Sequence, residues 1–146
     1  MEINLNSPFW RYNQLYKEEN DLYHDLTIRL GLSDSAFSIL YTICYLGGGC
    51  TQKEVCSCAF LSKQTVNSSV RKLEEQEILY LEKGQRRDTH LYLTEKGKAL
   101  AEEKIKPVID MELAAFSSLG EDSLTLVRLN AQYLSALRRE FENQKR

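Results

Sequence analysis

The sequence is poor in residues on which many enzymes depend. It has only two histidines, His24 and His90, and neither lies in an H-E-x-x-H zinc motif. It also has no phosphate-cradling glycine loop and no G-x-S-x-G nucleophile elbow. We therefore expect a protein that is not an enzyme and that needs no cofactor.

Long apolar runs and an export signal are missing too. No apolar run approaches the roughly 20 residues needed to cross a bilayer. The start, MEINLNSPFWRYN, has no basic stretch followed by an apolar one, so we expect no secretion signal and no membrane association. With 146 residues, of which 42% are hydrophobic and 27% charged, the composition favours one soluble, cytoplasmic domain, residues 1–146.

Positive charge is not in excess either. The formal net charge is −2, whereas nucleic-acid binders are often basic overall. At contact range the local charge decides, because electrostatic interactions are screened over about 8–10 Å at physiological salt. The segments 63–71 and 83–87 contain basic residues and no acidic ones, and the acidic residues of 74–77 follow the first of these segments.

Two helix starts lie close together in the middle of the chain. Thr51 and Glu54 form a T-x-x-E capping box, and Ser62 can cap a second helix. The short spacing between these two caps predicts a helix-turn-helix unit, in which the second helix enters a DNA groove.

The second of these helices is predicted to be amphipathic. Val66, Val70 and Leu73 recur on one stripe, which is typical of a buried face. Hydrogen-bonding side chains able to contact base edges and phosphates occupy the opposite face. An ordinary surface helix is the alternative interpretation. The candidate DNA contacts are Ser62, Lys63, Gln64, Thr65, Asn67, Ser68 and Arg71.

A β-hairpin with a basic tip follows. Leu79 and Leu81 alternate against Leu91 and Leu93 in two short runs separated by KGQRRDT. An arginine fork at a loop tip can enter a minor groove or bind phosphates. Arg86 and Arg87 are therefore candidate DNA contacts, although a solvated basic turn would have the same composition.

Helices are also predicted on both sides of this unit. Ser7 and Gly31 bracket one helix, and Ser33 begins another that ends at the glycines 47–49. Thr94 can cap a long helix that Pro107 should bend, because proline lacks a donor. A break at Leu119–Gly120 precedes a last helix from about 122 to 143.

The central segment resembles the multiple antibiotic resistance regulator (MarR) family of bacterial transcription factors. The similarity is carried by LSKQTVNSSVRKLEEQEIL, by GQRRD and by LYLTEKG, in which Leu93, Thr94 and Gly97 match the L-T-x-x-G marker. Arg87 matches the family's wing arginine. Gln85 replaces the aspartate of the family's D-x-R motif, and the adjacent Asp88 is a candidate substitute.

We therefore predict a mainly α protein with a small β-hairpin, a winged helix-turn-helix flanked by N- and C-terminal dimerisation helices. Residues 33–105 would form the winged helix-turn-helix, and 1–32 and 106–146 the dimerisation helices. The apolar end helices favour a homodimer, since they need a surface to bury against; an enlarged monomeric core is the alternative. Two copies would bind double-stranded DNA at an inverted repeat, and the resemblance implies a repressor.

Four cysteines, Cys44, Cys50, Cys56 and Cys58, lie within fifteen residues. Their C-x-C spacing fits zinc poorly, so no metal site is expected. Small buried hydrophobes are the favoured interpretation, and a redox-sensing regulator of the same fold is the alternative.

Aromatic residues are frequent in the first two predicted helices. The resemblance implies a small aromatic or phenolic effector bound between dimer helices and DNA-binding head, and we place its candidate wall at Trp10, Tyr16, Phe37 and Tyr41. Packing in the core or dimer interface is the alternative.

A winged-helix module that binds protein instead of DNA is the rival function, but the polar, cationic helix face favours DNA.

Overall fold

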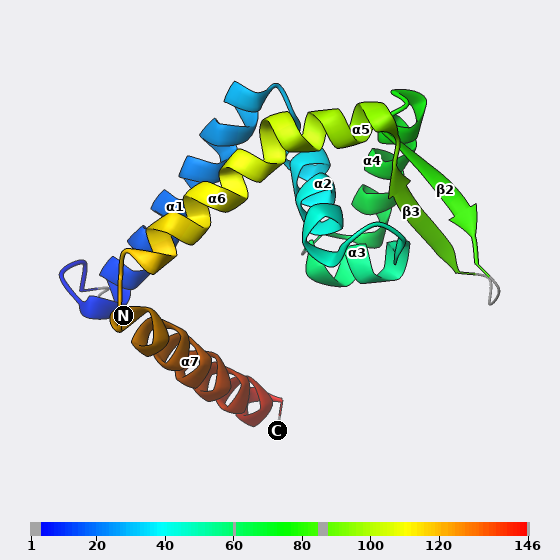
Figure 1. Ribbon diagram of the computed structural model, residues 1–146. Coiled ribbons are helices and arrows are strands. Elements are labelled where there is room, and N and C mark those ends of the chain that lie inside the picture. Colours follow the sequence, from blue (N-terminus) through cyan, green and yellow to red (C-terminus); the bar gives the residue numbers. More distant parts are fainter. Residues whose placement is uncertain (1–3, 60, 85–87, 146) are drawn as a thin grey trace. The chain divides into compact units, whose positions relative to one another are not determined.

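The computed structural model describes residues 4–59, 61–84 and 88–145. Its contacts divide the chain into two compact units, Met1–Lys106 and Pro107–Arg146. Figure 1 shows the order of the elements, from α1 to α7. The first unit contains the predicted helix-turn-helix and hairpin, and the second is helical.

The first two helices begin and end where the sequence predicts. In α1 (Pro8–Leu30) the Ser7 hydroxyl accepts a hydrogen bond from the Trp10 N–H at 3.1 Å, and Gly31 ends the helix at a φ of 68°. In α2 (Asp34–Leu46) the Ser33 hydroxyl accepts from the Ala36 N–H at 3.2 Å. Left-handed φ angles such as that of Gly31 favour glycine, which has no Cβ to clash.

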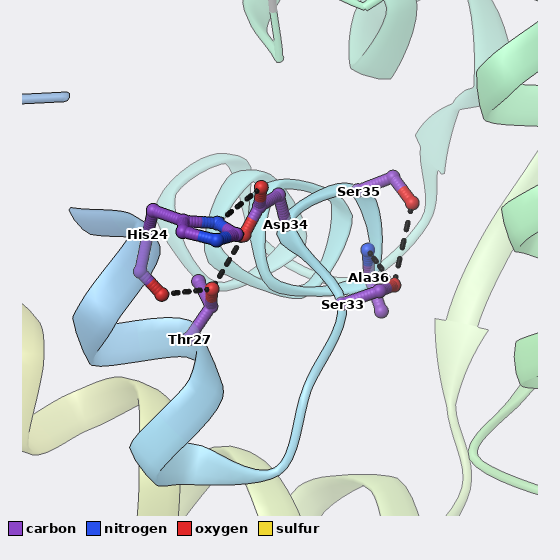
Figure 2. A network of polar contacts seen from close by, with 6 residues as sticks. All are labelled: His24, Thr27, Ser33, Asp34, Ser35 and Ala36. Atoms are coloured by element: carbon purple, nitrogen blue, oxygen red, sulfur yellow. Dashed lines mark hydrogen bonds and ion pairs between the residues drawn. The ribbon is translucent and has the colours of Figure 1, made fainter. Parts of the chain in front are cut away.

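A polar cluster joins the end of α1 to the start of α2 (Figure 2). The Asp34 carboxylate accepts hydrogen bonds from the Thr27 hydroxyl and from His24 Nδ1, the latter at 3.0 Å. The Thr27 hydrogen bond lowers the pKa of Asp34, an effect that burial partly opposes and His24 reinforces. The ionised carboxylate therefore links the last turns of α1 to the first turn of α2.

Replacing Asp34 with asparagine should reduce stability by about 1 kcal/mol at pH 7, since the charged acceptor is lost from a largely exposed site. The folded-state pKa lies below the ordinary value of 3.8, so this stabilisation is present above that pH and is lost as the pH falls below it. Urea unfolding at pH 7 and pH 3 measures it. Asp25→Asn, at an exposed neighbouring position, is the control; an equal loss for both variants would contradict the role of the cluster.

The helix-turn-helix consists of α3 (Gln52–Cys58) and α4 (Lys63–Glu75). Both predicted caps are present. The Thr51 and Glu54 capping box is complete, and the Ser62 hydroxyl accepts a hydrogen bond from the Thr65 N–H at 3.1 Å. As Figure 1 shows, α4 lies against α2 and against the hairpin.

Three strands form the sheet within the described residues: β1 (Cys50–Thr51), β2 (Leu79–Lys83) and β3 (Thr89–Leu93), in the order β1-β3-β2. The hairpin has the predicted register, with Leu79 opposite Leu93 and Leu81 opposite Leu91. The sequence did not predict β1, a two-residue strand that pairs with β3. It forms because the chain leaves the glycine turn beside β3, where the Gly49 N–H donates to the Leu91 carbonyl at 2.9 Å.

The core of the first unit lies between α2, the helix-turn-helix, the sheet and the segment after the hairpin. Its innermost side chains are aliphatic and no more than 2% exposed. Burial of this kind stabilises a fold by about 25 cal/mol per Å² of apolar surface. The largest of these side chains are Ile39, Leu40, Ile43, Val55, Val66, Leu73, Leu79, Leu91 and Ile105.

The helix after the hairpin is less regular than predicted. Thr94 caps α5 (Glu95–Leu100), as expected, but Ala101–Ile105 form a π-helical turn, η1, before α6 (Lys106–Ser117) begins. The irregularity predicted at Pro107 therefore takes the form of a wider turn just before it. A proline disturbs the turn that precedes it, because it lacks an N–H and crowds the carbonyl four residues back.

The second unit contains the rest of α6 and α7 (Asp122–Gln144), with the predicted break at Gly120, whose φ is 57°. Apolar side chains of this last helix are exposed in the single chain, among them Leu124 at 76% and Val127 at 54%, as expected of an end helix that needs a further surface to bury against. Among the described residues, no helix combines the length and the apolarity that crossing a membrane requires.

Candidate nucleic-acid interface

Helix α4 has one buried and one exposed face. Val66, Val70 and Leu73 are at most 2% exposed, and the buried Ser69 hydroxyl donates to Ser35 Oγ on α2 at 2.8 Å. This packing fixes the rotation of α4 about its axis. The exposed side, which we call the polar face of α4, consists of Ser62, Lys63, Gln64, Asn67, Ser68 and Arg71; the predicted Thr65 is half-buried.

Some hydroxyls of the polar face are engaged by the helix itself. Ser62 Oγ caps the first turn and lies 2.8 Å from Thr65 Oγ1. The Ser68 hydroxyl donates to the Thr65 carbonyl at 3.0 Å. The Ser68 proton and one proton of the Ser62–Thr65 pair are therefore used within the helix, so most of the outward donors belong to the longer side chains of the face.

The cations of the polar face are available to an external anion. Lys63 and Arg71 are exposed, and neither forms an ion pair with a carboxylate of the described chain. The acidic Glu74 and Glu75 come only in the last turn of α4. The first three turns therefore carry positive charge and hydrogen-bond donors, as contact with phosphates and base edges requires.

The start of α3 contacts the polar face of α4. The Gln52 side-chain amide donates a hydrogen bond to Asn67 Oδ1. Both residues line a cavity of about 490 Å³ between the two helices and the start of β3, and neither Gln52 nor this cavity was predicted from the sequence. Its other lining residues are Thr51, Lys53, Cys56, Lys63, Asp88 and Thr89.

The start of α3 is held firmly. The Glu54 carboxylate accepts hydrogen bonds from the Thr51 backbone N–H at 2.6 Å and from the Thr51 hydroxyl at 2.8 Å. The backbone hydrogen bond is the main reason that the pKa of Glu54 is lowered, and the hydroxyl adds to it. Because Thr51 also pairs with His90 of β3, the sheet and the capping box together fix the position of α3.

Hydrogen bonds hold the tip end of the hairpin and tie β3 to the turn before β1. The Gly84 N–H donates to the Asp88 carbonyl at 2.7 Å, and His90 Nδ1 donates to the Gly49 carbonyl at 2.7 Å. The predicted DNA contacts Arg86 and Arg87, and the neighbouring Gln85, lie outside the described residues. Their role therefore stays a prediction from the sequence.

Two of the four predicted effector contacts lie together. The rings of Phe37 and Tyr41 on α2 have centroids 5.7 Å apart, and Tyr45 continues the row at 6.0 Å from Tyr41. Phe37 is buried, so it is part of the core in the single chain. Trp10 and Tyr16 lie on α1, half-buried and exposed respectively. The shared effector site stays a prediction.

The cysteines are more varied than the sequence interpretation implied. Only Cys50 is buried; Cys56 is half-buried, and Cys44 and Cys58 are exposed. The interpretation of all four as buried hydrophobes is therefore wrong, because α2 and α3 turn two of them toward solvent. Desolvation by the surrounding protein atoms, with a smaller contribution from a nearby glutamate in each case, raises the pKa of Cys44 and Cys50, which disfavours the reactive thiolate at these positions. Among the described residues, no group of potential ligands could hold a metal ion.

Comparison with known proteins agrees with this architecture. Residues 30–88 match the model of the MarR family, whereas no curated protein sequence matches the chain significantly. A MarR family regulator from Neisseria meningitidis shares 24% identity over 93% of this chain and 99% of its own, with a TM-score of 0.73. Staphylococcus aureus MepR, in a complex with DNA, shares 20% over 92% and 99%, with a TM-score of 0.69. Bordetella bronchiseptica BpsR, whose DNA binding is regulated by 6-hydroxynicotinic acid, shares 16% over 92% and 98%, with a TM-score of 0.65. The predicted family resemblance and fold class are confirmed.

Proposed function

We propose that this chain, whose residues 30–88 match the model of the MarR family, is a transcriptional regulator that binds double-stranded DNA in a sequence-specific manner. Helix α4 would lie in the major groove, with its polar face toward the bases, and the hairpin tip would contact the DNA beside it. A regulator of this kind acts in the cytoplasm, where the bacterial chromosome lies, and most simply as a repressor.

One observation carries this proposal: the described chain buries one side of α4 and leaves the polar face uncovered. Lys63, Asn67 and Arg71 are all exposed on it. An exposed helix face that served only solubility would tolerate carboxylates, whereas this face has none before Glu74. The solved MepR–DNA complex supports the proposal, since that protein has the same fold and binds DNA.

We further propose that two copies act together. Large apolar side chains are exposed along α1 and α7 of the single chain, including Leu22 at 65% and Phe141 at 59%. A second copy would cover them in a symmetric dimer. Two α4 helices about 34 Å apart would then contact the two halves of an inverted repeat.

A small aromatic effector is part of the proposal. BpsR responds to 6-hydroxynicotinic acid, an aromatic compound with a hydroxyl group, and shares this fold. An effector of that chemistry, bound near Trp10, Tyr16, Phe37 and Tyr41, would act only if it bound the DNA-competent and DNA-incompetent states with different affinities.

Selection from a random pool of duplex DNA tests the function directly. We expect the full-length protein to enrich an inverted repeat, and a phenolic effector to reduce that enrichment. Enrichment of a single unrepeated site would remove the dimer from the mechanism. Retention of no duplex above background would remove DNA binding itself, and would favour a winged-helix module that binds protein.

Replacing Arg71 with alanine should weaken binding to the selected site about tenfold or more and relax the preference at one base position, if its guanidinium pairs with a guanine. Fluorescence anisotropy on selected and random duplexes measures both effects. Arg29→Ala, at an exposed arginine in the last turn of α1, is the control. An equal loss on both duplexes would make Arg71 a phosphate contact.

A further inference from the structure

Asn67 differs from its neighbours on the polar face because a residue of α3 determines the rotation of its side-chain amide. A carboxamide offers an acceptor oxygen and two N–H donors, and its rotation decides which of them faces outward. The oxygen of Asn67 accepts the hydrogen bond from Gln52 Nε2, so the Nδ2 donors are left to face a ligand.

Gln52 is well placed to hold this orientation. It is the first residue of α3 and is half-buried, and it directly follows Thr51, which is fixed by the capping box and by pairing with His90. Its backbone therefore has little freedom. The backbone of Asn67 is held in turn by Val66 and Val70, the buried residues of the same helix turn.

The orientation has a consequence for base recognition. Asparagine pairs with adenine in a bidentate manner, accepting from N6–H and donating to N7. That arrangement needs the Asn67 oxygen to face the base, whereas the hydrogen bond from Gln52 takes one of its two lone pairs and holds the oxygen toward α3. Outward Nδ2 donors instead suit bases that present acceptors in the major groove, namely guanine with N7 and O6, or thymine with O4.

We propose that Gln52 is a positioning residue that sets the base preference of Asn67, by engaging its oxygen and turning its amide donors toward the DNA. This inference rests on the proposed DNA-binding function. It assigns a role in sequence discrimination to the first helix of the helix-turn-helix, through a residue that need not contact a base.

The test compares three full-length variants in selection from a random duplex pool, followed by affinity measurements at all four base pairs of the position concerned. Asn67→Ala identifies that position. Gln52→Met removes the hydrogen bond at nearly unchanged side-chain length. Gln52→Glu provides only an acceptor, which should turn the Asn67 oxygen outward. Lys53→Met, in the same cavity, is the control for a change that should lower affinity for all sequences alike.

We expect the unmodified protein to prefer guanine or thymine at the position that Asn67→Ala flattens. Gln52→Met should raise the relative affinity for adenine there about tenfold, and Gln52→Glu should favour adenine or cytosine, which offer amino donors. An unchanged preference in Gln52→Met would overturn the inference, as would an Asn67→Ala variant that alters no position. Thermal unfolding of each variant separates these outcomes from loss of the fold. If the unmodified protein selects no sequence, the proposed function itself fails.

Discussion

Replacing Gly97 with alanine is expected to destabilise the protein by about 3 kcal/mol or more, because the added methyl group has no space. A Cβ at this position would lie 1.9 Å from the carbonyl oxygen of Ile78 and 2.9 Å from its carbonyl carbon. Both are backbone atoms, so no side-chain rotation relieves the clash. In an unhindered helix the same change would stabilise by about 1 kcal/mol, since alanine is the better helix former.

The Ile78 carbonyl cannot move away without breaking other contacts. It accepts hydrogen bonds from the Thr94 N–H at 3.1 Å and from the Thr94 hydroxyl at 3.2 Å. The single proton of that hydroxyl is shared with the Glu77 carbonyl, 2.6 Å away, and the hydroxyl oxygen accepts from the Gly97 N–H at 3.0 Å. The threonine and the glycine of the L-T-x-x-G marker therefore act together: one binds the turn between α4 and β2, and the other lets α5 approach it.

Gly48→Ala is the matched control for this prediction. A Cβ on Gly48 would lie 3.8 Å from a Tyr92 ring carbon, an ordinary van der Waals distance, so its effect should stay within about 0.5 kcal/mol. Urea unfolding followed by circular dichroism gives both values. A loss below about 1 kcal/mol in Gly97→Ala would show that α5 can shift without cost, contrary to the close packing described here.

The element boundaries were predictable because local contacts determine them. Ser7, Ser33, Thr51, Ser62 and Thr94 each accept a hydrogen bond from an N–H three residues ahead, and each of these caps could be identified from neighbouring letters of the sequence. The same holds for the polar face of α4, since the spacing of its apolar residues determines which side is buried.

The features that could not be predicted depend on contacts between distant residues. Strand β1 exists only because Leu91 lies opposite Cys50, and the sequence gives no periodic signal over two residues. The hydrogen bond between Gln52 and Asn67 joins positions fifteen residues apart, across a turn whose geometry the sequence leaves open. Gly97 could be matched to a family marker, but the reason for it, the carbonyl of Ile78, appears only in three dimensions.

The proposed dimer predicts that a substitution in α7 has a large effect on DNA affinity. Helix α7 has no buried residue in the single chain, although large apolar side chains recur along it. Leu134 is 48% exposed and Leu137 is 50% exposed. Exposed apolar surface of this extent is unusual for a protein that works as a monomer. A carboxylate placed in such a surface leaves the single chain folded but becomes costly once a partner covers it.

Leu134→Asp should therefore convert a dimer of about twice 16.9 kDa into a monomer, as measured by light scattering. It should also lower affinity for an inverted repeat by about 10²–10⁴-fold, because the second half-site is then no longer bound at high effective concentration. Affinity for one isolated half-site should change little, since α4 carries no substitution. Gln132→Asp adds the same charge at a polar position of α7 and is the control. A Leu134→Asp protein that stays dimeric, or that loses half-site and full-site binding equally, would contradict the view that α7 acts by joining two DNA-binding heads.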